Sequence, residues 1–411
     1  MATVRPFRAV RPADEYADRI AALPYDVYNR AEAKKVCDAN PLSFLRIDRA
    51  ETQFDDSVDT YAEEVYERAL DTYTDMKNKG YYLSDSSDCY YIYELTMNGR
   101  AQTGIVACAS IDDYANNVIK KHENTRADKE LDRIHHVDTM SAQTGPIFLA
   151  YHADKTVASV ISEYKKKTPV NDFTSDDGIT HRVWIIDGND DISAIMKAFE
   201  GMDSIYIADG HHRCASAVKV GFKRREANPG YTGDEEFNYF LSVLFPDEEL
   251  MIMDYNRVIK DLNGHSDEEV MDFLRKFGTL TLSGSEAVRP DKKGRCSMFF
   301  NNKWYIYDFN EDICSDDPVK GLDVSILQDR ILEPLFGIKD PKTDKRIDFI
   351  GGIRGLKELE RRVNEDCKIA FAMYPTQIEE LFNVADAGLL MPPKSTWFEP
   401  KLRSGLFIHE I

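Results

Sequence analysis

The chain has 411 residues, more than the roughly 250–300 at which a single hydrophobic core usually stops growing, so we expect two or three subdomains. With 43% hydrophobic and 30% charged residues, the composition is typical of a globular protein and excludes a fibrous or largely disordered one. The formal net charge of −20 repels the phosphate backbone and argues against DNA or RNA as the main partner, although a local cluster of Arg, His and backbone N–H groups can still bind a small anion.

The first part of the chain predicts a helix followed by a hairpin. Residues 57–80 carry apolar side chains at the period of about 3.6 residues that is typical of an amphipathic helix, and Gly80 stands at its natural C-terminal cap. Residues 89–96 and 103–111 are apolar runs that flank Asn98-Gly99, the strongest short-range hairpin signal. We therefore expect a long helix and a two-stranded antiparallel unit.

The middle of the chain alternates helices and buried strands. A polar loop and helix at residues 119–139 lead into this part of the sequence. The predicted strands are residues 145–151, 183–186 and 205–208, and the predicted helices are residues 192–199 and 215–220, the last of them stopped by Gly221. Such an alternation indicates strands brought together across helices.

The pattern changes near residue 260. Ser266 and Glu269 form a capping box that opens a helix through about residue 277, and residues 297–309 predict a hairpin around Asn301-Asn302. Farther on, we expect strand, helix, strand, helix and strand at residues 347–350, 356–363, 369–374, 378–387 and 406–411, with a capping box of Thr376 and Glu379 before the second helix.

The predicted fold class is α+β, with a mixed sheet in the core and mixed α/β texture throughout. We expect an N-terminal segment with the long helix at residues 1–88, a catalytic core at residues 89–260, and a C-terminal α/β subdomain at residues 261–411 that closes the site.

A run of chemically distinctive residues follows the predicted strand at residues 205–208, namely Asp209, Gly210, His211, His212 and Arg213. Where a strand leads into a helix N-terminus, free backbone N–H groups and the helix dipole favour an anion, and phosphate is the natural occupant. Gly210 permits close approach, Arg213 offers bidentate donors, and Asp209 could orient a histidine, hold Mg²⁺ or accept a proton from a hydroxyl nucleophile. The alternative is that the histidines merely cap the helix and satisfy buried partners.

A second cluster combines histidines with charged residues, His122, Glu123, Arg126, Arg133, His135 and His136. Its structural alternative is a solvated helix face with ion pairs between successive turns. It is not a zinc-protease motif, because no histidine stands at position 126. If the two clusters meet in space, His122 and Glu123 could serve as base or metal ligand, while Arg126 and Arg133 could bind phosphates.

Two further segments are candidates for substrate binding. Near the C-terminal end, proline pairs stiffen the backbone around Lys394, Ser395 and Thr396, and Lys401 adds a further charge; an ordinary surface loop is the alternative. Near the N-terminal end, Tyr25 and Asp26 follow a proline, and the favoured alternative there is a turn with a capping Asp.

Several classes of protein are disfavoured by what the sequence lacks. It contains no P-loop, no dinucleotide-binding glycine fingerprint and no nucleophile elbow. The seven cysteines are widely spaced without a Cys-x-x-Cys pair, so we expect reduced thiols. No apolar run reaches the roughly 18 residues of a membrane span, and no leader-like segment opens the sequence, so the expected location is the cytoplasm, with no membrane partner.

Four motifs in the same order resemble the bacterial and archaeal family known as domain of unknown function 1015. They are residues 24–27, residues 122–125 with Asp132-Arg133, residues 208–213, and residues 393–406, and together they span almost the whole chain. Cys214 departs from the pattern, since the family more often carries an aromatic residue there.

The run from Asp209 to Arg213 also looks like the phosphate-binding turn of the ParB and sulfiredoxin superfamily, which includes nucleotide-dependent kinases of free L-serine. That resemblance implies a ParB/sulfiredoxin-like core near residues 90–250. By carry-over, Asp209 would be the general base or Mg²⁺ partner and Glu123 a second acid near the serine hydroxyl. The phosphates would be bound by His211, His212 and Arg213.

Three functions therefore compete. The first is a small-molecule kinase that uses ATP or ADP and Mg²⁺ to phosphorylate the hydroxyl of free L-serine or a similar amino acid. The second is a regulator that binds a nucleotide or metabolite without transfer. The third is a metal-dependent hydrolase with ligands among His122, Glu123, Asp209, His211 and His212. A small-molecule substrate and a nucleotide are the expected partners, and a homodimer is left open.

Overall fold

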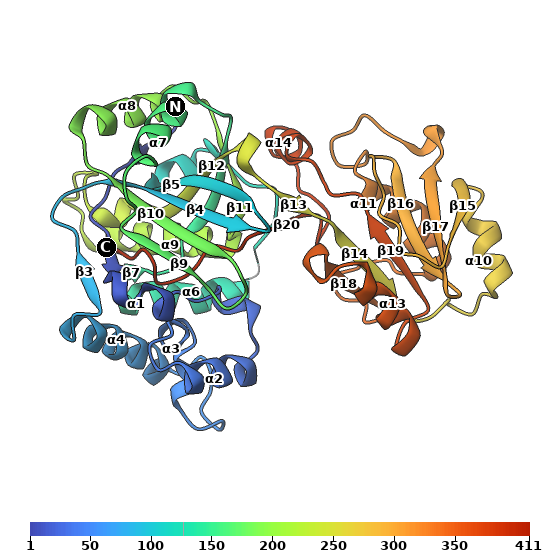
Figure 1. Cartoon of the computed structure of the whole chain (residues 1–411), viewed down its shortest axis with the longest axis horizontal. Helices are drawn as coiled ribbons and strands as arrows, with labels where there is room; N and C mark the ends of the chain where they lie inside the picture. Colours follow the sequence, from blue (N-terminus) through green and yellow to red (C-terminus); the bar gives the residue numbers. More distant parts are fainter. Residues whose placement is uncertain (126) are drawn as a thin grey trace. The chain divides into compact units, whose positions relative to one another are not determined.

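The computed structural model describes residues 1–125 and 127–411 and consists of two compact units (Figure 1). Unit 1 contains Met1–Leu250 together with Pro400–Ile411, and unit 2 contains Met251–Glu399. The sequence-based division assigns residues 400–411 to the C-terminal subdomain, whereas the contacts group them with unit 1. Unit 2 is thus inserted into the chain of unit 1.

Unit 1 is built on a mixed sheet of nine strands within the described residues, which confirms the predicted mixed α/β architecture. The strand order is β6-β11-β8-β12-β5-β4-β10-β9, and β1 pairs with β5. The pairs β11/β6 and β12/β8 are parallel, while the others are antiparallel. The bounds are β1 Val4–Arg5, β4 Tyr90–Met97, β5 Arg100–Ser110, β6 Ile119–Lys120, β8 Ile147–Tyr151, β9 Asn171–Thr174, β10 Thr180–Ile186, β11 Ile205–Asp209 and β12 Tyr239–Pro246.

The predicted hairpin is confirmed. Strands β4 and β5 pair antiparallel with Met97 opposite Arg100, and the two turn residues, Asn98 and Gly99, have φ of 52° and 80°. Positive φ at both central residues is the geometry that makes Asn-Gly the preferred hairpin turn. The hairpin lies in the middle of the sheet, so both strands are almost completely buried.

Helices pack against this sheet and bury its apolar strands. Side chains of α7 (Lys155–Tyr164), α8 (Asn189–Glu200) and α9 (His211–Ala227) join those of the strands in one hydrophobic core. Helix α6 (Ala127–Met140) packs along α9. Strand β11 and helix α9, which carry the run Asp209–Arg213, are therefore anchored in the core of unit 1.

The predicted helix at residues 57–80 is shorter in the structure, where α4 spans Glu63–Asn78. Residues before it form turns instead, because Asp55 and Asp59 accept hydrogen bonds from the backbone N–H groups two residues later. The Arg30 guanidinium also binds the Val58 carbonyl at 2.8 Å, which holds this segment against α2 (Arg30–Ala39). Local side-chain contacts thus replaced the first helical turns.

A second hydrophobic core lies under the N-terminal helices of unit 1. Val65, Ala69, Tyr73 and Met76 of α4 pack there with residues of α3 (Leu45–Asp48) and with Ile408. The backbone of Ile408 pairs with that of Val10 at 2.9 and 3.0 Å. This pairing explains why residues 400–411 belong to unit 1. The predicted strand at residues 406–411 is reduced to β21 (His409–Glu410), which pairs with β7 (Ala142–Gln143).

Unit 2 contains an antiparallel sheet of six strands in the order β15-β17-β16-β19-β14-β18. The hairpin predicted around Asn301-Asn302 and the capping box of Ser266 and Glu269 are both confirmed. The bounds are β14 Tyr255–Ile259, β15 Gly278–Gly284, β16 Arg295–Phe300, β17 Lys303–Phe309, β18 Ile347–Gly351, β19 Ile369–Met373, α10 Asp267–Leu274, α13 Leu356–Glu365 and α14 Ile378–Asp386.

One predicted capping box in unit 2 is displaced by one residue. Gln377 and Glu380, rather than Thr376 and Glu379, close the box before α14. The Thr376 hydroxyl instead donates to the Ser395 carbonyl at 2.9 Å, so that its hydroxyl is not available to cap the helix. All seven cysteines are free thiols, as expected from their spacing. No helix in the described part of the chain is long and apolar enough to cross a membrane.

Helix α9 runs through Gly221 instead of stopping there, which corrects the helix predicted at residues 215–220. A Cβ on Gly221 would lie 2.8 Å from the Ile111 side chain and closer still to the Phe237 carbonyl oxygen. The glycine therefore serves the close packing of the helix and not its termination.

We predict that Gly221→Ala lowers the free energy of unfolding by about 1–3 kcal/mol, because overpacking outweighs the gain of roughly 1 kcal/mol in helix propensity. Urea denaturation followed by circular dichroism measures the change. Gly230→Ala is the matched control, since a Cβ at Gly230 meets nothing within 4 Å. Equal stability of the two variants would contradict the packing argument.

Candidate functional site

The turn between β11 and α9 exposes the N-terminus of a long buried helix. Gly210 links the two elements with a φ of 93°, a conformation that favours glycine, and as the N-cap residue of α9 it has no side chain to cap the first turn. The start of α9 presents backbone N–H groups at the positive end of the helix dipole, which favours an anion.

Asp209 ends β11 and pairs with a residue far away in the sequence. Its Oδ2 lies 2.8 Å from Lys401 Nζ, and its Oδ1 accepts the Gly210 N–H at 2.8 Å. Although burial raises the pKa of the Asp209 carboxyl, the charges of Lys401 and Arg213 hold it well below its ordinary value. Asp209 is therefore a carboxylate throughout the neutral range, with 36% of its side chain exposed.

Arg213 lies one turn into α9 and reaches across to the segment before β8. Its Nη1 donates to the Pro146 carbonyl at 2.8 Å. A Cβ on Gly145 would lie 3.4 Å from Arg213 Nη1 and 3.2 Å from Ser404 Oγ, so this glycine leaves room for both groups. Sequence analysis missed Gly145 and Ser404 as site residues; the Gly-Pro pair before a predicted strand was the available signal for the first.

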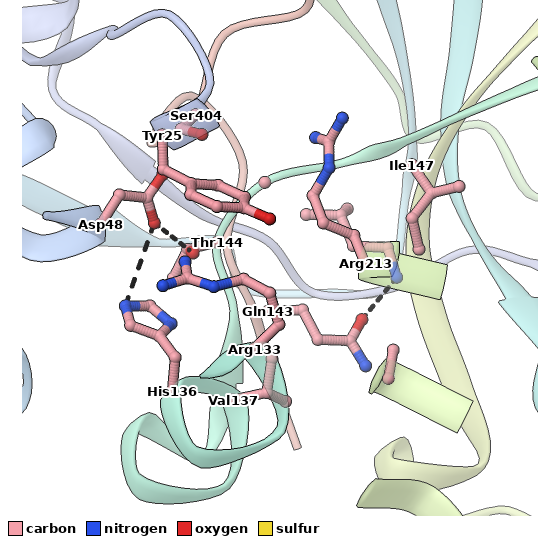
Figure 2. Close-up of a pocket in the computed structure, with 13 residues that line it drawn as sticks. Tyr25, Asp48, Arg133, His136, Val137, Gln143, Thr144, Ile147, Arg213 and Ser404 are labelled. Carbon is pink, nitrogen blue, oxygen red and sulfur yellow. Dashed lines mark hydrogen bonds and ion pairs between the residues drawn. The ribbon is translucent and has the colours of Figure 1, made fainter. Parts of the chain in front are cut away.

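Arg213 lines a pocket that we call the arginine pocket. Its walls include Tyr25, Asp48, Arg133, His136, Gly145 and Ser404. Figure 2 shows Tyr25, Arg133 and His136 on one side of it and Arg213 on the other. The structure thus brings together three predicted residues, Tyr25, Arg133 and Arg213, from separate segments of the chain. Two guanidiniums facing one pocket suit a phosphate or carboxylate group.

Arg133 is held in place from two sides. Its Nη2 lies 3.0 Å from Asp132 Oδ2, and its guanidinium carbon lies 4.0 Å from the centroid of the Tyr25 ring. Burial raises the pKa of the Tyr25 hydroxyl to about 12, so the ring stays neutral. Burial and the nearby Arg133 charge lower the pKa of His136 to about 4, so that this imidazole is neutral as well. Arg133 and Arg213 are then the cationic groups of the pocket.

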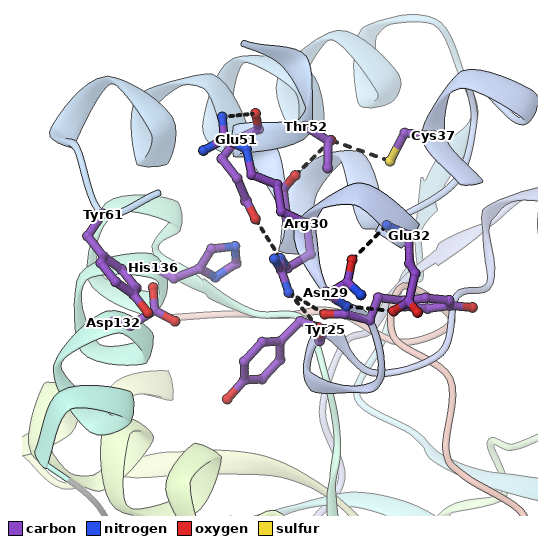
Figure 3. Close-up of polar contacts among 12 residues, drawn as sticks. Tyr25, Asn29, Arg30, Glu32, Cys37, Glu51, Thr52, Tyr61, Asp132 and His136 are labelled. Carbon is purple, nitrogen blue, oxygen red and sulfur yellow. Dashed lines mark hydrogen bonds and ion pairs between the residues drawn. The ribbon is translucent and has the colours of Figure 1, made fainter. Parts of the chain in front are cut away.

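A second cavity of about 210 Å³ adjoins the arginine pocket and shares Tyr25, Asp48, Arg133 and His136 with it. We call it the tyrosine cavity, after Tyr25, Tyr28, Tyr61 and Tyr66 in its walls. Figure 3 labels two of them, Tyr25 and Tyr61. Asp26, a predicted substrate-binding residue, also lines it. The two predicted segments around residues 25 and 133 therefore meet in the walls of the same two cavities of unit 1.

His122 and His211 form a buried pair beside the turn. Their rings are perpendicular, with centroids 4.5 Å apart, and the His122 Nδ1 has no hydrogen-bond partner among the described residues. Burial lowers the pKa of His122 to about 4 and also lowers that of His211. Both imidazoles are therefore neutral near pH 7. Glu123, the next residue in the chain, is exposed, and His212 is half-buried.

The functional roles predicted for the remaining site residues stay predictions. Arg126 lies outside the described residues. Lys394, Ser395 and Thr396 belong to unit 2, where the Ser395 hydroxyl donates to the Pro392 carbonyl at 2.7 Å and Lys394 Nζ lies 5.5 Å from the Tyr255 ring centroid. Lys401 forms an ion pair with Asp209, a contact that the sequence did not indicate.

No three His, Cys, Asp or Glu side chains gather to hold a metal ion in the part of the chain that the structure describes. Asp209 offers a single ionised carboxylate at the anion-binding turn. Mg²⁺ in nucleotide sites is often held by one or two carboxylates together with phosphate oxygens and water, and Asp209 fits that more limited requirement.

A model of the family described as "Protein of unknown function (DUF1015)" matches residues 4–325. A search among curated proteins found no match. Among solved structures, the chain is similar to a free serine kinase variant in complex with ADP, with 14% identity and a TM-score of 0.34 over 75% of this chain and 93% of that one.

Two further solved structures are similar at the same level. C-terminally truncated SbnI from Staphylococcus aureus has 10% identity and a TM-score of 0.38 over 74% of this chain and 86% of its own. A conserved hypothetical protein from Pyrococcus furiosus has 15% identity and a TM-score of 0.33 over 74% and 94%. Such low scores carry no argument about the site, which we therefore interpret from its own residues.

The buried histidines predict how stability depends on pH. Because the pKa of His122 falls from its ordinary 6.5 to about 4 on folding, the unfolded chain binds more protons between these values, and stability is lost as the pH falls through that window. Replacing His122 by Phe removes this contribution.

The free energy of unfolding should fall as the pH is lowered from about 7 to about 4.5. We predict that this fall is about 1–2 kcal/mol smaller in His122→Phe than in the wild type. Urea denaturation at the two pH values measures the difference. His135→Phe, which changes an exposed histidine of α6, should follow the wild type. The same acid sensitivity in His122→Phe and the wild type would show that His122 is not a buried neutral group.

Proposed function

Since the chain belongs to the DUF1015 family, whose description names no activity, we propose from its site that it is a nucleotide-dependent kinase of the hydroxyl group of free L-serine or a similar amino acid. The observation that carries this proposal is the combination of Asp209, Lys401 and Arg213 at the uncapped N-terminus of α9. The choice of acceptor follows the resemblance of residues 209–213 to the free-serine kinases. We also propose that residues 90–250, which include β11 and α9, form a ParB/sulfiredoxin-like core.

Phosphate binding is the first requirement of a kinase, and two features support it. The first turn of α9 presents backbone N–H groups at the positive end of the helix dipole. Arg213 and Arg133, which both line the arginine pocket, add two guanidiniums with bidentate geometry. In phosphoryl transfer, most of the catalysis comes from positioning and from cations that stabilise charge on the transferred group.

The charge state of Asp209 bears on its role. A general base works best when its pKa lies near the working pH, whereas the pKa of Asp209 lies well below its ordinary value. Asp209 therefore suits a cation partner better than a proton acceptor, and we assign it to Mg²⁺. When bound, Mg²⁺ would neutralise charge on the nucleotide phosphates.

Glu123 is then the better candidate for the base. It is exposed and follows His122, whose backbone N–H approaches His211 Nε2 at 3.5 Å, so the chain itself places Glu123 beside the turn. In the proposed step, the acceptor hydroxyl oxygen bonds to the terminal phosphorus of the nucleotide. The bond from that phosphorus to the bridging oxygen breaks, the nucleotide leaves with one phosphate fewer, and the hydroxyl proton passes to the carboxylate.

We predict that the wild type forms O-phosphoserine, or the phosphate ester of a similar amino acid, from Mg²⁺ and ATP or ADP, and that Asp209→Asn lowers the rate by at least roughly a hundredfold. Phosphorus NMR of a screen against free amino acids measures the product. Asp203→Asn, which changes an exposed carboxylate just before β11, is the matched control and should retain the wild-type rate.

The screen separates the competing functions. Nucleotide binding without any phosphorylated product would favour a regulator that binds a nucleotide without transfer. Neither binding nor turnover would mean that the turn before α9 is not a phosphate site. Equal rates for Asp209→Asn and the wild type would leave a kinase in which Asp209 has no part.

A further inference from the structure

The tyrosine cavity has no role in the phosphate chemistry of the turn, and its walls are chemically different. Four carboxylates line it, Asp26, Asp48, Glu51 and Asp132, against the two guanidiniums of Arg49 and Arg133. The shared His136 is neutral near pH 7, because burial lowers its pKa to about 4. The cavity therefore carries an excess of hydrogen-bond acceptors and negative charge, which excludes it as a second phosphate site.

Two of the four carboxylates are already paired. Glu51 Oε1 lies 2.6 Å from Arg49 Nε, and Asp132 binds Arg133 at 3.0 Å and the Tyr66 hydroxyl at 3.0 Å. Asp26 forms no ion pair with any residue that the structure describes, and Asp48 accepts only the Thr144 hydroxyl as a close hydrogen-bond donor, at 3.0 Å. The oxygens of Asp26 and Asp48 thus remain able to accept hydrogen bonds from a ligand.

The aromatic part of the wall indicates the shape of that ligand. Tyr25, Tyr28, Tyr61 and Tyr66 line one cavity, and Figure 3 draws Tyr61 and Tyr25 with Asp132 and His136. The Tyr61 side chain is 52% exposed although it lines the cavity, so one of its surfaces is uncovered in the protein alone. The volume of the cavity is about 210 Å³. It is much larger than the ammonium group of a small amino acid requires.

Arg133 is common to the walls of this cavity and of the arginine pocket. It lines both, and its guanidinium stacks on Tyr25 with 4.0 Å between its carbon and the ring centroid. A single molecule that extends through the junction would meet aromatic rings and carboxylates at one end and two guanidiniums at the other. A nucleotide has this arrangement, because its base and ribose are planar and rich in N–H and O–H donors, whereas its phosphates are anionic.

We propose that the tyrosine cavity binds the nucleoside part of the phosphoryl donor. The base packs against Tyr61, and amino or ribose hydroxyl groups donate to Asp26 and Asp48. The phosphates lie at Arg133 and Arg213 and extend toward the N-terminus of α9. This inference rests on the proposed function, since it assigns the nucleoside subsite of the same nucleotide.

The test compares the affinities of ADP and inorganic pyrophosphate by isothermal titration calorimetry, because only ADP carries a nucleoside. Wild type should bind ADP more tightly than pyrophosphate. Tyr61→Ser should weaken ADP binding by roughly tenfold or more, the size expected for losing one stacked aromatic ring, and leave pyrophosphate binding unchanged. Arg213→Gln should weaken both ligands. Asp26→Asn, a smaller change in the same cavity, should weaken ADP alone.

Tyr231→Ser is the matched control, since Tyr231 is 41% exposed in unit 1 and lines neither the arginine pocket nor the tyrosine cavity. If ADP binds to Tyr61→Ser and Asp26→Asn as it does to the wild type, the assignment of the cavity is overturned while nucleotide binding stands. The same holds if these variants lose affinity for free serine instead, which would make the cavity the acceptor subsite. If the wild type binds neither ADP nor pyrophosphate, the proposed function fails first.

Discussion

The ion pair between Asp209 and Lys401 joins residues that are 192 positions apart, and the rest of the site depends on it. Lys401 is held there because residues 400–411 return to unit 1, where the Ile408 backbone pairs with Val10 and the Ser404 backbone with Ala22. The same return places Ser404 against Gly145 and Arg213. A single backbone connection therefore positions the positive charge beside Asp209 and completes the wall of the arginine pocket.

The site contains charged side chains and neutral histidines close to one another. Lys401 and Arg213 hold the pKa of the Asp209 carboxyl well below its ordinary value, while burial lowers the pKa of the nearby histidines His122, His136 and His211, so that these are neutral near pH 7. A neutral imidazole can accept a hydrogen bond as well as donate one, which a protonated imidazole cannot. In the proposed function, phosphate recognition falls to the guanidiniums and backbone N–H groups. His122 and His211, predicted from the sequence as catalytic groups, would then contribute packing and hydrogen-bonding capacity around the turn.

The sequence predicted correctly those turns whose conformation depends only on neighbouring residues. The hairpin at Asn98-Gly99 needs only positive φ at adjacent residues, and the turn at Gly210 follows a buried strand that ends in polar residues. Contacts between distant segments left no such signal. No residue near Lys401 in the sequence indicates that it pairs with Asp209. From the sequence alone Gly221 is predicted to end a helix, because its close packing against Ile111 is visible only in the structure. The tyrosine cavity was equally inaccessible, because its walls come from residues near 25, 50, 60 and 132.

The insertion of unit 2 between Leu250 and Pro400 has a consequence for biosynthesis. Ribosomes deliver the chain from its N-terminal end, so residues 1–250 emerge with the central strands β11 and β12 but without the segment that carries Lys401 and pairs with Val10. Until residues 251–399 have also been made, Asp209 has no Lys401 partner and the second core lacks Ile408. A nascent chain or a prematurely terminated product can therefore contain the strands of the large sheet while lacking Lys401 and Ser404, which complete the proposed phosphate site.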